Sequence, residues 1–181
     1  MVWNHRWEYD KNPGEFFAVL DALAGRGVEF RVAILGECFS RSPDEFTAAR
    51  ERLGERVVAF GYAEDFGEYA AWLRAARVVP VTSRQDFFGA SIVEAVYCGC
   101  HPLLPRRLAY PDVIPPADFH AGVFYDDARD LERRLEAVLA GGPPPAARSL
   151  GAAMRRYDWS VLAPEYDGRL EHLWKQRSVT S

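Results

Sequence analysis

Two carboxylates flank a glycine in the segment QDFFGASIVEA, where Asp86 precedes Gly89 and Glu94 follows it. A glycine at the start of a helix lets the backbone approach a ligand closely. The free amides of Gly89, Ala90 and Ser91 would form an anion site there. Glu94 could accept two hydrogen bonds from a vicinal diol such as a ribose, and Asp86 could bind a hydroxyl group beyond the phosphate. Taken alone, the two acids would also suit the solvated flanks of an ordinary helix.

A second polar segment, NHRWEYDKNP, follows the first expected strand and carries Arg6 and Lys11. The planar fork of arginine and the point charge of lysine both suit a diphosphate. His5 in the same segment is a candidate ligand contact. Surface cations are usually only solvated, so this segment supports a binding site only when it is considered together with the first segment. Together they predict one site for a diphosphate, a ribose and a sugar if both lie at the same edge of a sheet.

Short apolar runs alternate with amphipathic stretches along the chain. This alternation predicts a Rossmann-like, three-layer α/β fold, in which helices cover both faces of a parallel sheet. Ligands bind at the carboxyl ends of the strands in such folds, and Pro80 is unusual for a central strand. The expected strands are Val2–Asn4, Glu29–Gly36, RVVAFG, RVVPVTS, His101–Pro105 and GVFY. The expected helices are Pro13–Ala24, Pro43–Leu53, Phe66–Ala75, Gly89–Cys98, Ala128–Leu139, Ala146–Arg156 and Ser160–Trp174.

Composition excludes several classes of protein. The 181 residues suit one domain, and a net charge of −4 gives no global basic field for a nucleic acid or a membrane surface. No apolar run approaches the length of a membrane span. Cys98 and Cys100 lack zinc-site spacing, so we expect no metal, and an odd number of cysteines fits a reducing cytosol. No Walker or G-x-G-x-x-G motif occurs, which argues against a nucleoside triphosphatase or a dinucleotide enzyme.

These segments resemble the C-terminal half of the GT-B retaining glycosyltransferases. NHRWEYDKNP is similar to the G-R-x-x-x-x-K-G loop of that group, DFFGASIVEA to its E-x7-E segment, and YDWSVLAPEYDGRL to its closing helix. The resemblance covers essentially the whole chain. It implies that Arg6 and Lys11 neutralise the leaving diphosphate, that Glu94 holds the ribose and that Asp86 holds a sugar hydroxyl.

The same resemblance gives roles to further residues. It implies that the backbone amides of Phe88 to Ser91 contact the sugar and phosphate, and that Gly36 and Glu37 lie beside the nucleotide base. Two positions depart from the family pattern. Asp86 replaces a glutamate, which shortens the reach to the sugar, and His5 replaces a glycine, which puts a backbone contact in doubt.

The strings LGECF, FFGASIVEAVYCGCHPLLP and YPDVIP resemble one cytosolic branch, the tRNA-queuosine α-mannosyltransferases. The branch implies GDP-mannose as the donor, queuosine in tRNA as the acceptor, metal-free chemistry and retention at the anomeric carbon. Residues 1–181 would then be the nucleotide-sugar-binding domain, inactive without an N-terminal acceptor domain. Contacts to tRNA would lie on that other domain or on a basic patch such as Arg106–Arg107. The last helix would expose an apolar face of Leu162, Tyr166, Leu170 and Leu173, or use it in a dimer.

Two alternatives stay open. The chain could serve a GT-B enzyme with another nucleotide-sugar and a non-RNA acceptor. It could also be a non-catalytic nucleotide-binding domain, for which the aspartate at position 86 is the only hint.

Overall fold

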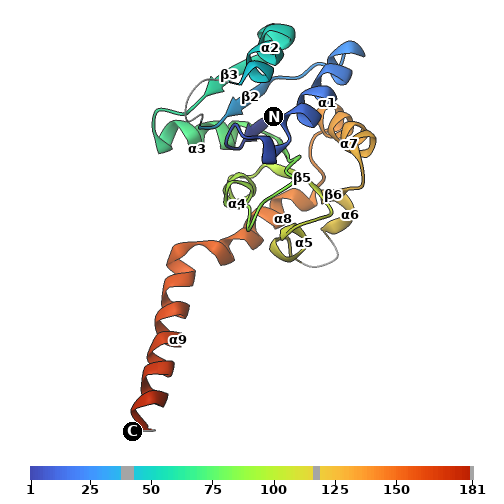
Figure 1. The fold of residues 1–181 in the computed structure, drawn as a ribbon. Coiled ribbons are helices and arrows are strands. Elements are labelled where there is room, and N and C mark those ends of the chain that lie inside the picture. The colour runs from blue at the N-terminus through green and yellow to red at the C-terminus, as the bar shows by residue number, and fades with distance from the viewer. Residues whose placement is uncertain (38–42, 116–118, 180–181) are drawn as a thin grey trace.

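The computed structural model describes residues 1–37, 43–115 and 119–179 (Figure 1). The strands are β1 Val2–Asn4, β2 Val32–Leu35, β3 Val57–Gly61, β4 Val78–Pro80, β5 His101–Pro105 and β6 Phe124–Tyr125. The α-helices are α1 Pro13–Gly25, α2 Asp44–Leu53, α3 Phe66–Ala75, α4 Ala90–Tyr97, α5 Tyr110–Val113, α6 His120–Val123, α7 Ala128–Gly141, α8 Ala146–Ala153 and α9 Trp159–Val179. Short 3-10 helices are η1 Tyr9–Lys11, η2 Gly54–Arg56 and η3 Met154–Tyr157.

The strands form two parallel sheets of three, in the orders β1-β2-β3 and β4-β5-β6. β1 lies beside β4, so the two sheets continue each other in the order β3-β2-β1-β4-β5-β6. This is the strand order of a doubly wound nucleotide-binding fold, whose ligand crevice opens where the order reverses. The predicted α/β, Rossmann-like class is therefore confirmed, and the crevice falls between the loops that follow β1 and β4.

No β-ladder joins β1 to β4 in the described residues, and Pro80 gives a physical reason. The amide of Val81 donates to the carbonyl of Leu103 on β5 at 2.9 Å. Backbone groups of successive residues point to opposite edges of a strand, so the nitrogen of Pro80 faces β1. A proline nitrogen has no hydrogen to donate. We call this boundary between β1 and β4 the seam.

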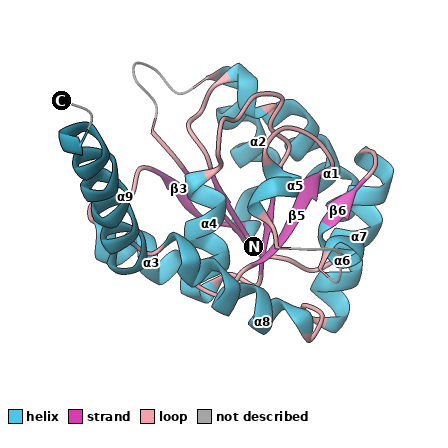
Figure 2. Ribbon diagram, turned by 90° about the horizontal axis from the view of Figure 1, so that it is seen from below, coloured by secondary structure: helices cyan, strands magenta, loops and turns pink. Residues whose placement is uncertain are grey.

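Two apolar clusters cover the two faces of the sheets, and helices lie on both sides of the strands (Figure 2). Neighbouring strand residues alternate between them, as the period of two in a strand requires. One cluster packs α1, α2 and α7 against Trp3, Ile34, Val78 and Leu103. The other packs α3, α4, α5 and α8 against Val2, Ala33, Val79 and Leu104. The prediction of helices on both faces is confirmed.

Helix α9 leaves the body of the domain and extends away from it (Figure 1). Its predicted apolar face is exposed at Tyr166, Leu170 and Leu173, while Leu162 is half-buried. Among the described residues, none of the helices has both the length and the apolar composition needed to cross a lipid bilayer.

Candidate functional site

Two pockets open at the carboxyl ends of the strands, and both span the seam. The smaller has a volume of about 310 Å³ and is lined by residues that include Asn4, Gly36, Tyr62, Phe66, Tyr69 and Glu94. The larger has a volume of about 660 Å³ and is lined by residues that include Arg6, Tyr9, Lys11, Asp86, Phe87, Phe88, Gly89 and Ala90. The loop after β1 and the entry of α4 therefore share one edge, as the sequence predicted.

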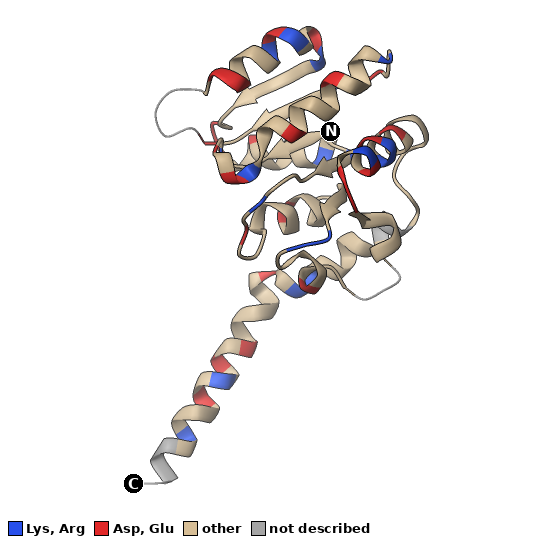
Figure 3. Ribbon diagram, turned by 45° about the vertical axis from the view of Figure 1, so that its right-hand side comes forward, with Lys and Arg blue, Asp and Glu red and all other residues tan. Residues whose placement is uncertain are grey.

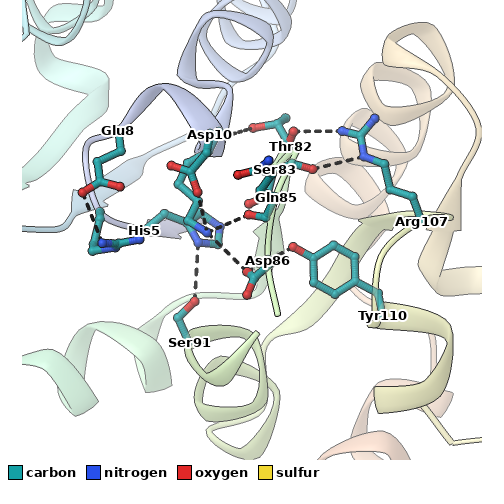
Figure 4. A network of polar contacts seen from close by, with 12 residues as sticks. His5, Glu8, Asp10, Thr82, Ser83, Gln85, Asp86, Ser91, Arg107 and Tyr110 are labelled. Carbon is teal, nitrogen blue, oxygen red and sulfur yellow. Dashed lines mark hydrogen bonds and ion pairs between the residues drawn. The ribbon is translucent and has the colours of Figure 1, made fainter. Parts of the chain in front are cut away.

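Lys11 is held inside the larger pocket by oxygen atoms of three residues, Asp10, Gln85 and Asp86, which lie close together in Figure 4. Its Nζ donates to the carbonyl of Gln85 at 2.9 Å and lies 3.2 Å from Oδ2 of Asp10 and 3.6 Å from Oδ2 of Asp86. Only 8% of Lys11 is exposed. Two carboxylates thus partly neutralise the cation before any ligand arrives, a pairing that the sequence did not reveal.

Asp86 is fixed by protein contacts on one of its oxygen atoms. The hydroxyl of Tyr110 donates to Oδ2 of Asp86 at 3.2 Å, and Lys11 faces the same oxygen. Burial raises the pKa of Tyr110, so its hydroxyl keeps the proton that it donates. These contacts, and not the length of the side chain alone, set the position of the carboxylate.

Arg6 reaches the same pocket from a more exposed position. Half of its side chain is exposed (51%), and Nη1 lies 3.2 Å from Oε1 of Glu8. A surface pair of this kind contributes little to stability, so the guanidinium can turn to another anion at small cost. The role of Arg6 in neutralising a diphosphate stays a prediction.

Gly89 opens helix α4 from the left-handed backbone region, with φ at +85°. Its carbonyl accepts from the amides of Ile92 and Val93, so α4 begins as predicted. Gly89 and Ala90 line the larger pocket. Within the described residues, Ser91 lines neither pocket. Its carbonyl accepts a hydrogen bond from Nδ2 of Asn4 at 2.8 Å.

Gly89→Ala is expected to lower the free energy of unfolding by about 2 kcal/mol. The added methyl group would lie 3.1 Å from Cδ1 of Ile92 and 3.2 Å from Cε1 of Tyr110, in a backbone region that alanine avoids. Urea denaturation measures the change. Gly25→Ala is the matched control, because its methyl group meets nothing within 4 Å. Equal stability of the two variants would contradict the prediction.

A chain of hydrogen bonds holds Glu94 in the smaller pocket. Nδ2 of Asn4 donates to the hydroxyl of Tyr69 at 2.9 Å, and Tyr69 donates to Oε2 of Glu94 at 2.8 Å. Burial raises the pKa of Tyr69, which keeps the hydroxyl a donor. Sequence analysis missed both partners. Asn4 could have been found as a polar residue at the carboxyl end of a strand, but no spacing pointed to Tyr69.

Gly36 and Glu37 follow β2 at the edge of the smaller pocket. A methyl group on Gly36 would lie 1.9 Å from the carbonyl oxygen of His5, so the close approach of the two loops requires a glycine. Glu37 is exposed and is not among the described residues that line the pocket. Its carbonyl accepts a hydrogen bond from the amide of Trp7 at 3.1 Å. Tyr62 and Phe66 line the pocket and are each 75% exposed, and sequence analysis missed both.

His5, a predicted ligand contact, is buried behind the two pockets and lines neither as described. Its Nδ1 lies 3.4 Å from Oγ of Ser91, and its Nε2 has no hydrogen-bond partner within the described part of the chain. Burial, and then the charge of Lys11, lower the pKa of His5 to about 4. The imidazole is therefore neutral at pH 7 and adds no charge to the site.

The low pKa of buried His5 is expected to lower the free energy of unfolding by about 2 kcal/mol between pH 7 and pH 5. The folded pKa is about 4 and the unfolded value is 6.5. Protons therefore bind the unfolded chain first, and stability is lost as the pH falls from 6.5 toward 4. Chemical denaturation at the two pH values measures the loss. Burial also lowers the pKa of His101, so the contribution of His5 is the difference between the wild type and His5→Gln. An equal loss in both proteins would contradict the prediction.

No protein-family profile matches the chain. Among solved structures, it superposes on Anabaena HepE in complex with UDP with a TM-score of 0.74 and 18% identity, covering 94% of this chain and 48% of that one. It also superposes on the C-terminal domain of the glycosyl transferase group 1 protein LpcC from Francisella tularensis with a TM-score of 0.68 and 17% identity, covering 87% and 84%. The chain thus has the fold of a domain of the GT-B glycosyltransferases.

In sequence, the chain is similar to the tRNA-queuosine alpha-mannosyltransferase of Drosophila melanogaster. The two are 39% identical over 135 residues, which cover 75% of this chain and 34% of that protein. The chain therefore spans about a third of the length of this curated relative.

Proposed function

We propose that this chain is the donor-binding half of a retaining glycosyltransferase, which transfers mannose from GDP-mannose to queuosine in tRNA. The observation that carries the proposal is the pair of pockets at the carboxyl ends of the strands, both of which span the seam. One contains Glu94, a carboxylate suited to a ribose, and the other contains Arg6, Lys11 and the entry of α4, which suit a diphosphate.

The pockets suggest how the donor lies. The nucleoside would occupy the smaller pocket, where the exposed rings of Tyr62 and Phe66 offer apolar faces to a base and Glu94 meets the ribose. The diphosphate would run to the amides of Gly89 and Ala90. The sugar would then reach Asp86 in the larger pocket.

This arrangement would stabilise the leaving group. Negative charge builds on the diphosphate as the glycosidic bond breaks, and fixed cations or amides at that point lower the barrier. Arg6 can leave Glu8, and the positive end of the α4 dipole already faces the pocket. Lys11 would share its charge between Asp86 and the diphosphate. We propose no metal in this step.

The finer parts of the proposal rest on the similarity to the Drosophila enzyme. They are the mannosyl group, the queuosine acceptor, the N-terminal acceptor domain and the cytosolic location expected of a tRNA-modifying enzyme. The relative is much longer than the aligned region, which supports an acceptor domain in the whole protein.

Calorimetric titration of the chain with GDP, UDP and ADP tests the donor. The proposal predicts that GDP binds most tightly. Tighter binding of UDP would favour the second candidate, an enzyme with another donor, for which the UDP complex of HepE is the supporting observation. If none of the three binds, the chain is not a donor-binding domain.

A further inference from the structure

Two exposed aromatic rings stand at the opening of the larger pocket. Phe87 is fully exposed (103%) and Tyr9 is 79% exposed, and both line the pocket that contains Lys11 and Asp86. They come from different elements, Tyr9 from η1 and Phe87 from the loop between β4 and α4. No described residue covers the ring of Phe87, so this ring is available to a partner.

Arg84 holds the ring of Tyr9 in place. Its Nη1 donates to the hydroxyl of Tyr9 at 2.6 Å, and its guanidinium carbon lies 5.2 Å from the centre of the ring. A ring fixed in this way loses little side-chain entropy when a ligand stacks on it. Among the described residues, Arg84 has no carboxylate in an ion pair, whereas Arg6 and Lys11 each have one or more.

The basic patch expected at Arg106–Arg107 is occupied by internal contacts. Arg107 donates to the carbonyl of Ser83 at 3.1 Å and to that of Thr82 at 3.0 Å, and Arg106 lies over the ring of Phe124. Acidic and basic residues are mixed over the rest of the domain (Figure 3). Both arginines are nevertheless exposed, so the expected patch stays a prediction, and Arg84 is a second exposed cation next to the pocket.

We propose that Tyr9, Arg84 and Phe87 form an RNA-binding rim, on which unpaired bases of the acceptor stack while Arg84 contacts a phosphate. The inference rests on the proposed function, because it takes the larger pocket as the place of the donor sugar. An acceptor must reach that sugar, so it meets the residues at the opening. Single-stranded RNA presents flat bases that stack on aromatic side chains and on arginine, which is the chemistry of these three residues.

The test measures binding of a labelled RNA stem–loop, which presents unpaired bases in its loop, to the chain by fluorescence anisotropy. Phe87→Ala and Tyr9→Ala should each weaken binding roughly tenfold, by analogy with the loss of one base–aromatic contact. Tyr166→Ala, an exposed aromatic on α9, is the matched control and should leave RNA binding unchanged. Arg84→Gln should lower the slope of log K against log salt by about one, as the loss of one phosphate contact does.

A fully paired RNA of the same length should bind more weakly than the stem–loop. The inference is overturned if the chain does not bind the stem–loop, if it prefers the paired RNA, or if Phe87→Ala and Tyr9→Ala bind like Tyr166→Ala. In the last case the RNA binds away from the rim. GDP binding by the wild-type chain is measured in parallel. If the rim variants bind RNA as Tyr166→Ala does while the wild type still binds GDP, only this inference is contradicted. If the wild type binds no nucleotide, the proposed function is contradicted.

Discussion

Arg6→Ala is expected to lower the kcat of the whole glycosyltransferase about 100-fold, as the loss of a single transition-state donor does. The guanidinium would neutralise charge that appears on the diphosphate only as the bond to the sugar breaks, so the loss should fall on kcat. The side chain of Arg6 is half exposed, and its one ion pair within the described residues is with Glu8, so the variant should fold normally. Single-turnover transfer from the proposed donor, GDP-mannose, measures the effect.

Arg129→Ala on α7 is the control for Arg6→Ala, because Arg129 is exposed and lines neither pocket. Lys11→Ala should also slow transfer strongly, but it leaves Asp10 and Asp86 without their shared cation. Its Tm must therefore be measured beside its activity. Normal turnover by the double variant of Arg6 and Lys11 would show that neither residue stabilises the leaving group.

Glu94→Ala is expected to weaken GDP binding by the chain about fiftyfold, which corresponds to roughly 2.3 kcal/mol. The substitution removes the carboxylate and, with it, the proposed hydrogen bonds to the ribose diol. A hydrogen bond to a charged group contributes about 1.5–3 kcal/mol. Tyr69→Phe removes the bond to Oε2 of Glu94 and the bond that the Tyr69 hydroxyl accepts from Asn4, but it keeps the carboxylate. Its affinity should therefore lie between those of the wild type and Glu94→Ala. Calorimetry measures all three.

A GDP analogue without the two ribose hydroxyls identifies the contact. The wild type should bind this analogue about as weakly as Glu94→Ala binds GDP, and Glu94→Ala should not distinguish the two ligands. If the variant still prefers GDP to the analogue, another residue holds the ribose.

The sequence predicted the fold because the alternation of apolar runs and amphipathic stretches is local. Element boundaries were less certain. The strand expected at Glu29–Gly36 is only Val32–Leu35, because β1 pairs with β2 from Ala33 onward and β3 pairs with it from Val32. Residues 29–31 therefore lack the ladder that would make them part of the strand.

The candidate site was predictable in part for a similar reason. Residues in the loops that follow strands, such as Arg6 and Asp86, lie at one edge of a parallel sheet because the strands all end there. Their partners were not predictable. Tyr69 lies 25 residues from Glu94 and Tyr110 lies 24 residues from Asp86, and no helical or strand period links such pairs. The ion pair of Lys11 with Asp86 also depends on three-dimensional packing.

The seam at Pro80 gives a bound nucleotide a mechanical role. Side chains, without backbone hydrogen bonds, connect β1 to β4 in the described residues, and both pockets draw walls from the two sides of this boundary. A ligand that spans them would add a further connection across this boundary, beside the hydrogen bonds that the amides of Arg84 and Gln85 donate to the carbonyl of Asp10. Amide protons of β2 and β5, on opposite sides of the boundary, should then exchange more slowly together when the nucleotide is present.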